Sequence, residues 1–502
     1  MATLSNPSNV ELSGPKTHLI ITDLTISFCS ATEPLPTCDL DSPTWLRIEK
    51  DLYLHTARQT AWLQIAQARE DDLTAEALVV TEISVGELHP HTSSGLGKEN
   101  SWECRPAGIW VLRSPYTGDR HQAVTAVDVL FGIDAVDPRP LWALMETPLQ
   151  LGADPEVPVA RLTDGKFKIV QISDTHIVTG VGVCKDAIDA HGNSLSEREA
   201  DPITVNFLGG VLDAEKPDLA VLTGDQLHHD ILDSQSAIFK VVAPLIERSI
   251  PYAVVFGNHD DEGTYALSRK AQMSLYQDLP FSFCHSGPEQ VEGVGNYYLQ
   301  ILDSSPSQLP LSTLYFLDSH GQIPSNIKDP DYTPIQQSQI DWFTCTSQAL
   351  REDRRPKDKT HLSLAFMHIP VPEFADSDLI IRGGERREPT EGPSFNSHFY
   401  DALAQEGVAV LGCGHDHVND FCALRPSQRN GDTPYGPWLC YGGGSGFGGY
   451  CSYGDKRYHR RARVFELDTN KGGIRTWKRV EYARERIDEI VLVDRGKAVE
   501  PA

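Results

Sequence analysis

The sequence lacks a long uninterrupted apolar run. Residues 1–16 are polar, and the apolar stretch 18–28 is interrupted by Asp23. A membrane-spanning helix needs about 20 predominantly apolar residues, and a signal peptide needs a continuous apolar segment near the amino terminus. We therefore predict no signal peptide, no membrane span and a cytoplasmic location.

Basic residues are also scarce. The chain has 44 Lys and Arg against 70 Asp and Glu, a net charge of −26, and no long basic run. This balance disfavours binding of extended nucleic acid through its phosphates, so we predict no nucleic-acid partner. A phosphorylated substrate is not excluded, because bound cations can reverse the local field of an acidic protein.

The ten cysteines are dispersed and form no CxxC pair. Free thiols in a reducing compartment are the simplest interpretation, and a disulfide between Cys29 and Cys38 stays open as an alternative. The glycine-rich tract 442–449 lacks the GxxxxGK[ST] pattern, so it does not indicate a nucleotide-binding P-loop. We predict a tight loop close to the functional site.

Five short polar motifs do stand out, because each follows a short apolar run typical of a buried strand. They are Asp-Thr-His at 174–176, Gly-Asp at 224–225, Gly-Asn-His-Asp at 257–260, His368, and Gly-His-Asp-His at 414–417. Helical segments near 203–214 and 234–248 separate the first three strands, and each ends before a proline, Pro217 or Pro251. This alternation predicts an α/β fold with parallel βαβ units. We predict that each motif closes a strand of one parallel sheet, so that the motifs meet at its carboxyl edge.

The motifs contain the carboxylate, amide and imidazole groups that bind divalent metals. We expect two metal ions, either divalent or trivalent, with Asp225 as the bridging ligand. The other predicted ligands are Asp174, His176 and His417 for one ion, and Asn258, His368 and His415 for the other. His259 is the predicted catalytic acid for the leaving group, and Asp260 would orient its imidazole and raise its pKa.

Taken singly, these residues have structural explanations. Asn258 and His259 could cap a helix, His368 could be a core histidine, and Asp174 could simply end a strand. The ordered set favours the metal site, because five motifs must agree. Further residues are weaker candidates for lining the site, and for most of them a structural role is favoured: Asp318, His320, Asn396, Ser397, His398, Arg382, Arg386 and Arg387.

The five motifs together resemble the calcineurin-like metallophosphoesterase superfamily. The segments 414–420, 439–444 and 460–464 look more narrowly like its purple-acid-phosphatase-like fungal and plant branch. This resemblance implies a two-sheet α/β/β/α sandwich over residues 159–482. It also implies an amino-terminal β-rich accessory domain over 1–158, where strand-like runs occur at 19–28, 77–85, 109–112 and 123–131, while the charged residues 483–502 would form a peripheral tail.

One departure from that branch concerns the metals. True purple enzymes carry a metal-bound tyrosine three residues after the bridging aspartate and a glycine in the first motif, where this chain has His228 and His176. Without the tyrosinate, a ferric ion is less strongly indicated, and the two metals could be Fe, Mn or Zn.

The resemblance implies a phosphatase that hydrolyses phosphate monoesters, including phosphoprotein Ser/Thr, by attack of a hydroxide that bridges the two metals. One alternative is a phosphodiesterase acting on a nucleotide or lipid headgroup, since pocket shape decides between the two. The other is a non-catalytic scaffold that keeps the fold.

Overall fold

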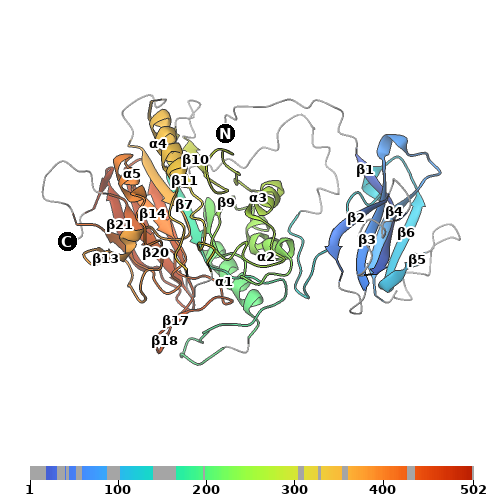
Figure 1. Ribbon diagram of the computed structural model, residues 1–502, viewed down its shortest axis with the longest axis horizontal. Helices are drawn as coiled ribbons and strands as arrows, with labels where there is room; N and C mark the ends of the chain where they lie inside the picture. The colour runs from blue at the N-terminus through green and yellow to red at the C-terminus, as the bar shows by residue number, and fades with distance from the viewer. Residues whose placement is uncertain are drawn as a thin grey trace. The chain divides into compact units, whose positions relative to one another are not determined.

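The computed structural model describes residues 18–30, 40, 45–52, 59–86, 102–139, 165–195, 198–302, 310–325, 330–352, 360–426 and 436–499. These residues fall into two compact units. The amino-terminal unit ends at Val129, and the larger unit holds residues 130–139 and 165–499 (Figure 1). The predicted domain boundary at 158/159 lies outside the described residues.

The amino-terminal unit contains two antiparallel three-stranded sheets. One has the order β1-β3-β2 and the other β4-β6-β5, and Ile21, Leu24, Val80 and Val111 belong to one buried cluster. The bounds are β1 Leu19–Ser30, β2 Trp45–Asp51, β3 Gln59–Arg69, β4 Leu78–Val85, β5 Trp102–Arg105 and β6 Ile109–Pro115.

Three of the four strands predicted in this unit are confirmed, and the one at 123–131 is wrong. That segment is not a strand. Val124 instead donates its N–H to Val80 O and accepts from the N–H of Ile21, so it joins one sheet to the other through single hydrogen bonds. Its apolar character comes from Val127 and Val129, which pack with Val124 against the buried cluster.

The larger unit is built on two seven-stranded sheets. The first has the order β22-β21-β20-β19-β7-β8-β9, and β7, β8 and β9 are parallel. Its strands are β7 Lys166–Ile172, β8 Leu219–Thr223, β9 Tyr252–Val255, β19 Arg461–Asp468, β20 Gly473–Val480, β21 Ile487–Asp494 and β22 Lys497–Ala498. Helices α1 (Ala200–Glu215) and α2 (Ser234–Ile246) connect the parallel strands, which confirms the predicted βαβ units, and α3 (Arg269–Asp278) follows β9.

The second sheet has the order β10-β11-β12-β14-β16-β15-β13. Its strands are β10 Tyr297–Leu302, β11 Pro310–Phe316, β12 Leu362–Phe366, β13 Ile380–Arg382, β14 Val410–Cys413, β15 Cys422–Leu424 and β16 Trp438–Tyr441. Helices α4 (Gln337–Glu352) and α5 (Phe399–Gln405) belong to this half, and a small hairpin pairs β17 (Ser452–Tyr453) with β18 (Lys456–Arg457).

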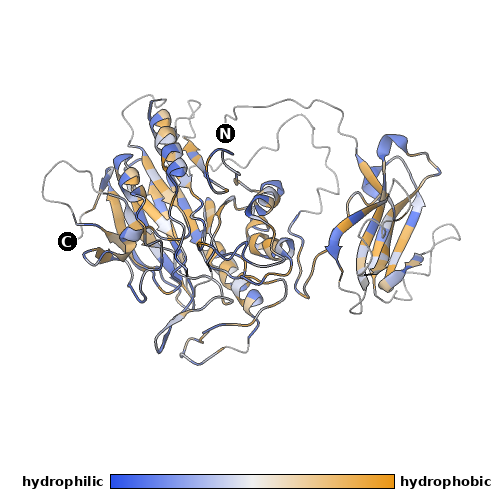
Figure 2. Cartoon of the chain, viewed as in Figure 1, coloured by the Kyte–Doolittle hydropathy of each residue, from blue (hydrophilic) through white to orange (hydrophobic). Residues whose placement is uncertain are grey.

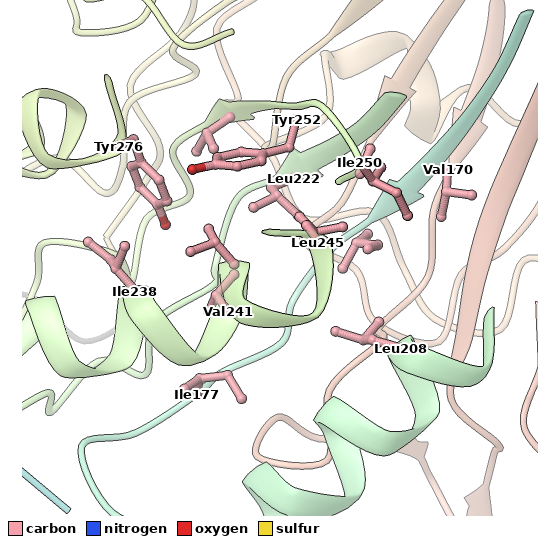
Figure 3. Close-up of a cluster of buried hydrophobic side chains, with 14 of the residues drawn as sticks. Val170, Ile177, Leu208, Leu222, Ile238, Val241, Leu245, Ile250, Tyr252 and Tyr276 are labelled. Atoms are coloured by element: carbon pink, nitrogen blue, oxygen red, sulfur yellow. The ribbon is translucent and has the colours of Figure 1, made fainter. Parts of the chain in front are cut away.

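Three apolar layers show that the unit is an α/β/β/α sandwich, as the resemblance implies. Side chains of α1 and α2 pack with Val170 and Leu222 of the first sheet (Figure 3). A central cluster joins Val221 of the first sheet to Leu364 of the second, and Phe343 of α4 lies in a third cluster with strands of the second sheet. The strands are accordingly rich in hydrophobic residues (Figure 2).

The five motifs do not follow strands of one sheet, so that prediction is wrong. Three follow β7, β8 and β9 in the first sheet, whereas His368 follows β12 and the motif at 414–417 follows β14 in the second. Apolar strands in two stacked sheets have the same sequence pattern as strands in one, because both are buried on both faces. The motifs therefore converge across the sandwich.

The carboxyl end also differs from expectation. Residues 487–494 form β21, which pairs with β20 and buries Leu492 and Val493, so this segment is part of the sheet and not a peripheral tail. The strands β19 and β20 pair antiparallel as a hairpin. Among the described residues no helix is both long and apolar enough to span a membrane.

One cysteine pair departs from the expectation of free thiols. Cys422 on β15 lies opposite Cys440 on β16, and the two are joined by a disulfide. Six other described cysteines are free: Cys104, Cys184, Cys284, Cys345, Cys413 and Cys451. Cys38, half of the alternative pairing, lies outside the described residues.

Candidate metal centre

The loops that follow β7, β8 and β14 turn sharply at polar residues. Asp174, His176, Asp225 and His415 have φ values of 56°, 47°, 51° and 76°, a left-handed conformation that is uncommon for residues other than glycine. Backbone hydrogen bonds hold the first two loops together, since Asp174 N donates to Gly224 O and His176 N to Asp225 O. Strain of this kind is concentrated at functional sites, and here it turns four predicted ligands toward one point.

One cluster consists of Asp174, His176 and His417, all buried. The Nε2 atoms of the two imidazoles face each other at 3.2 Å, and His417 Nε2 lies 3.4 Å from Asp174 Oδ1. His417 Nδ1 donates to Tyr450 O at 2.8 Å, which leaves its Nε2 lone pair directed inward. A shared cation suits this arrangement, because metal-binding imidazoles are commonly oriented through the opposite ring nitrogen.

A second cluster consists of Asp225, His368 and His415, and Asn258 follows Gly257, whose backbone packs against Asp225. His368 Nδ1 donates to Thr223 O at 2.7 Å, and its Nε2 lies 3.2 Å from Asp225 Oδ2. Buried polar atoms normally have a hydrogen-bond partner. Three here have none, namely Asn258 Oδ1, His368 Nε2 and His415 Nε2, and these are the atoms that would ligate a metal.

Asp225 joins the two clusters. Its Oδ2 lies 3.2 Å from His368 Nε2 in the second cluster and 3.9 Å from His176 Nε2 in the first. Its Oδ1 accepts the backbone N–H of His259 at 2.9 Å, which fixes the carboxylate. One carboxylate oxygen within 4 Å of imidazoles from both clusters has the position that a bridging ligand requires.

The charges of this site are poorly compensated by the protein alone. Burial raises the pKa of Asp174 to about 7; the charge of Asp225 acts in the same direction and His368 opposes it. Burial lowers the pKa of His417 to about 3. Burial also acts to lower the pKa of His368, but the charges of Asp225 and Asp174 raise it to about 9. His368 can therefore supply one buried positive charge for two buried carboxylates, and a bound cation would compensate the rest.

His259 lies at the edge of the centre with its side chain 33% exposed. Its Nε2 is 4.0 Å from Asp225 Oδ2, and its Nδ1 is hydrogen bonded to Glu262. Burial alone would lower the pKa of His259, but the Asp225 charge and the Glu262 hydrogen bond raise it to about 9. The imidazole is therefore protonated near neutral pH.

Asp260 has a different role from the predicted one. Its carboxylate accepts three backbone N–H groups, those of Asp225, Leu227 and Gly257, at 3.0, 2.9 and 2.7 Å. The prediction that Asp260 orients the His259 imidazole is wrong, because Glu262 does so. Asp260 instead fixes the loops that carry Asp225 and His259.

The weaker candidates mostly have structural partners. Asp318 is bound to Arg269, and His320 Nε2 lies 2.8 Å from Gln339 Oε1, although both residues line an open cavity of about 780 Å³ that begins at Asn258. Asn396 donates to Glu373. Each of the remaining candidates has its own place in the structure. Arg382 lies on β13, Arg386 donates to Phe374 O, Arg387 forms an ion pair with Asp420, Ser397 lines a small cavity, and His398 pairs with Asp401.

The glycine-rich tract lies against the first cluster, as the sequence predicts. A Cβ atom on Gly449 would lie 2.5 Å from His417 Cε1 and 2.6 Å from His176 Cδ2. Real Cβ atoms do not approach other atoms so closely, so the backbone of this loop passes where no side chain fits. The tract thus confines both imidazoles.

Sequence reasoning missed the residues that support this cluster. The Tyr450 ring stacks on His417 with centroids 4.0 Å apart, and its hydroxyl lies 3.1 Å from both carboxylate oxygens of Glu388. The same Glu388 accepts the N–H of Val418. A tyrosine directly after the glycine tract was the available signal, but its partner lies 62 residues away in sequence.

Comparisons with known proteins find the following similarities. The phosphatase DCR2 of Saccharomyces cerevisiae is 38% identical over 396 residues, which cover 72% of this chain and 65% of that protein. The probable inactive purple acid phosphatase 29 of Arabidopsis thaliana is 36% identical over 342 residues, 63% of this chain and 83% of that protein. A dimetal phosphatase structure from Danio rerio superimposes with a TM-score of 0.41 at 12% identity, covering 65% of this chain and 98% of that one.

The chain thus spans about two thirds of the length of the yeast relative and most of the plant one. The sequence also matches the family of calcineurin-like phosphoesterases over residues 167–419. That range begins in β7 and includes all five motifs, so the match and the converging side chains describe the same site. The chain belongs to the calcineurin-like phosphoesterase family.

Proposed function

We propose that the protein is a metal-dependent phosphatase that hydrolyses phosphate monoesters at a centre of two cations. The observation that supports this most strongly is the position of Asp225, whose Oδ2 lies within 4 Å of imidazoles from both clusters. Two bound cations would supply Lewis-acid activation of the phosphoryl group and of the attacking water.

The proposed ligands divide between the two clusters. Asp174, His176 and His417 would hold one cation, and Asn258, His368 and His415 the other, with Asp225 shared. The donor set of imidazole, carboxylate and amide suits Fe, Mn or Zn. The residue three positions after Asp225 is His228, whose Nδ1 is bound to Asp230, so no tyrosinate is available at that position to favour a ferric ion.

His259 is the proposed proton donor to the leaving alcohol. Its imidazole is held by Glu262 through Nδ1, which leaves Nε2 free to carry a proton toward the centre. Proton donation from a positioned imidazole contributes about 10²–10⁴-fold to a rate. The surroundings that raise its pKa keep this proton in place at neutral pH.

The substrate would be a phosphorylated small molecule or protein. The yeast relative is named a phosphatase, which supports phosphate ester hydrolysis without identifying the alcohol. The chain carries a net charge of −26, so an anionic substrate would gain most of its attraction from the bound cations.

The test is hydrolysis of an aryl phosphate monoester and of the matching diester by wild type and by Asp225→Ala, with metal content counted in each. We expect about two metals per chain and monoester turnover in wild type, and loss of both in the variant. A clear preference for the diester would replace the proposal with a phosphodiesterase.

A non-catalytic scaffold is the second candidate, and one observation favours it. Relatives from Arabidopsis thaliana at 33–36% identity are named probable inactive purple acid phosphatases. Wild-type protein that holds two metals but turns over neither ester would support this candidate. In this chain, however, every proposed ligand type is retained and converges on the centre.

A further inference from the structure

Lys185 is an exposed cation that contacts His228, a neighbour of the metal centre. It lies on the segment between β7 and α1, and its Nζ is 3.1 Å from His228 Nε2. Within the described part of the chain, no carboxylate lies at ion-pair distance from this ammonium, whereas the buried lysines Lys240 and Lys478 each contact two carboxylates. The Lys185 side chain is exposed, unlike those of Lys240 and Lys478, so in a protein with a net charge of −26 its ammonium is open to an anionic ligand.

His228 determines how this ammonium is held. Its Nδ1 lies 2.6 Å from Asp230 Oδ1, so the ring hydrogen points to the carboxylate and the Nε2 lone pair accepts from Lys185. An ammonium has three N–H donors, and the imidazole uses one of them. The other two are available to a ligand.

The backbone of Lys185 is also anchored. Its N–H donates to Phe447 O at 2.9 Å, and its carbonyl accepts from Arg460 Nη2 at 2.5 Å. Arg460 donates in addition to Gly449 O at 2.9 Å, and Gly449 is the residue that packs on His176 and His417. The position of Lys185 is therefore fixed to the loop that confines the first metal cluster.

A row of imidazoles leads from Lys185 to the proposed catalytic acid. The His228 ring meets His176 edge-on at 5.8 Å and lies 4.1 Å from the ring of His229, and His229 lies 5.6 Å from His259. The nearby acidic groups are engaged elsewhere, Asp230 by His228 and Asp186 by Cys451 N and Ser452 Oγ. Lys185 thus lies on the same rim of the centre as His259.

We propose that Lys185, held by His228, is a subsite for a second negative group on the substrate, a carboxylate or a second phosphate on the alcohol portion. This inference rests on the proposed phosphatase function and narrows its substrate class. Charge-assisted hydrogen bonds from an ammonium are strong where the partner is fixed. Lys185 would favour anionic alcohols over neutral ones, because it offers a local positive charge on a protein that is acidic overall.

The experiment measures binding without turnover. Manganese-loaded protein is titrated calorimetrically with propylphosphonate, 3-phosphonopropionate and propane-1,3-bisphosphonate, which share a phosphonate and differ in the second group. We expect wild type to bind at least one of the two doubly charged probes about tenfold more tightly than propylphosphonate, the effect of one charge-assisted hydrogen bond. The probe that binds more tightly than propylphosphonate identifies the second group as a carboxylate or a phosphate.

Lys185→Met should abolish this preference while the affinity for propylphosphonate and the metal content stay within about twofold. His228→Phe should reduce the preference severalfold, since the ammonium loses its positioning contact. Lys270→Met is the matched control: Lys270 is an exposed lysine that lines the cavity beside Asn258, and its removal should leave the preference intact.

Several results would overturn the subsite. They are equal wild-type affinities for all three probes, absence of binding, a preference that survives in Lys185→Met, and a preference that disappears in Lys270→Met instead. Loss of metal together with all binding in Lys185→Met would assign the lysine a structural role. The phosphatase proposal fails separately, through absence of aryl phosphate turnover by wild type.

Discussion

The metal centre and the cluster around Asp420, both in the larger unit, differ in how their buried polar atoms are paired. Around Asp420, the cations Arg387, Arg461 and Lys478 contact the two carboxylate oxygens at 2.5, 2.7 and 2.8 Å. At the metal centre, carboxylates lie among imidazoles whose inward nitrogens lack hydrogen-bond partners, as in His368 and His415. A buried charge that protein groups satisfy fully is a structural element, whereas a buried set of acceptors without donors is incomplete until a ligand binds.

The difference extends to proton affinity. Although burial opposes it, Arg461, Lys478 and Arg387 hold the pKa of Asp420 well below its usual range, while burial raises the pKa of Asp174. Both carboxylates are nearly inaccessible to solvent. Protein cations thus favour the charged form of Asp420, whereas burial favours the neutral form of Asp174, and a bound cation would favour the charged form of Asp174.

The largest expected effect is on stability, from Asp420→Asn. Removing one partner of a buried ion pair costs about 3–5 kcal/mol, because it leaves the other charges uncompensated. Chemical denaturation should therefore show a loss of this size, while metal content in the folded fraction is unchanged. A loss below about 1 kcal/mol would contradict the assigned role of this cluster.

The same variant should change acid sensitivity. Because the folded-state pKa of Asp420 is depressed, its contribution to stability is complete above the unfolded pKa of about 4 and is lost as the pH falls through lower values. Wild type should lose more stability than Asp420→Asn between about pH 4 and pH 2. Parallel slopes would show that Asp420 is not linked to acid unfolding.

Next in size is the effect of Asp225→Asn on activity. An amide keeps the shape but not the charge shared by the two clusters, so we expect hydrolysis to fall at least about 100-fold, more than supporting residues of metal sites usually cost. Metal analysis should show loss from both sites. Folding should be retained, and a variant that keeps two metals would argue against Asp225 as the shared ligand.

Gly449→Ala tests the confinement of the first cluster. The added methyl group would overlap the His176 and His417 rings, and overpacking of this kind costs about 1–3 kcal/mol. We expect selective loss of one metal, with the cation at the second cluster retained. Gly210→Ala is the control, because a Cβ atom there meets nothing within 4 Å.

The smallest effect is expected for Tyr450→Phe. The ring remains stacked on His417, but the hydroxyl that contacts Glu388 is lost, and removal of a group that supports a metal ligand typically lowers affinity about 10–100-fold. Metal competition with a chelator should place this variant near the lower end of that range. An unchanged affinity would restrict the role of Tyr450 to its ring and carbonyl.

Much of this site was predictable from the sequence, and the reasons are local. A strand that ends in Asp-x-His or Gly-Asn-His-Asp places its polar groups at the end of the strand regardless of the rest of the fold. The assignment of strands to two sheets was not predictable, because burial on both faces gives β8 and β12 the same apolar pattern. The resemblance to the family supplied the sandwich instead.

The side-chain partners of the site residues could not be predicted from the sequence. Glu262 and Asp260 both lie within three residues of His259, and only the backbone geometry shows that Asp260 faces the amides of Asp225 and Gly257. The contact of Tyr450 with Glu388 and the pairing of Cys422 with Cys440 depend on how strands align. The charged residues near the carboxyl end obscured β21, since three of its four exposed positions, Asp488, Glu489 and Asp494, are acidic.

Each proposed cation would be held from both sheets. Asp174 and His176 follow a strand of the first sheet and His417 a strand of the second, and the other cluster divides Asp225 and Asn258 from His368 and His415 in the same way. The cations would then act as crosslinks between the two halves of the sandwich at this edge. Occupancy at a concentration 1,000 times the dissociation constant adds about 4 kcal/mol per site to stability, so supply of metal would govern the survival of the folded chain as well as its chemistry.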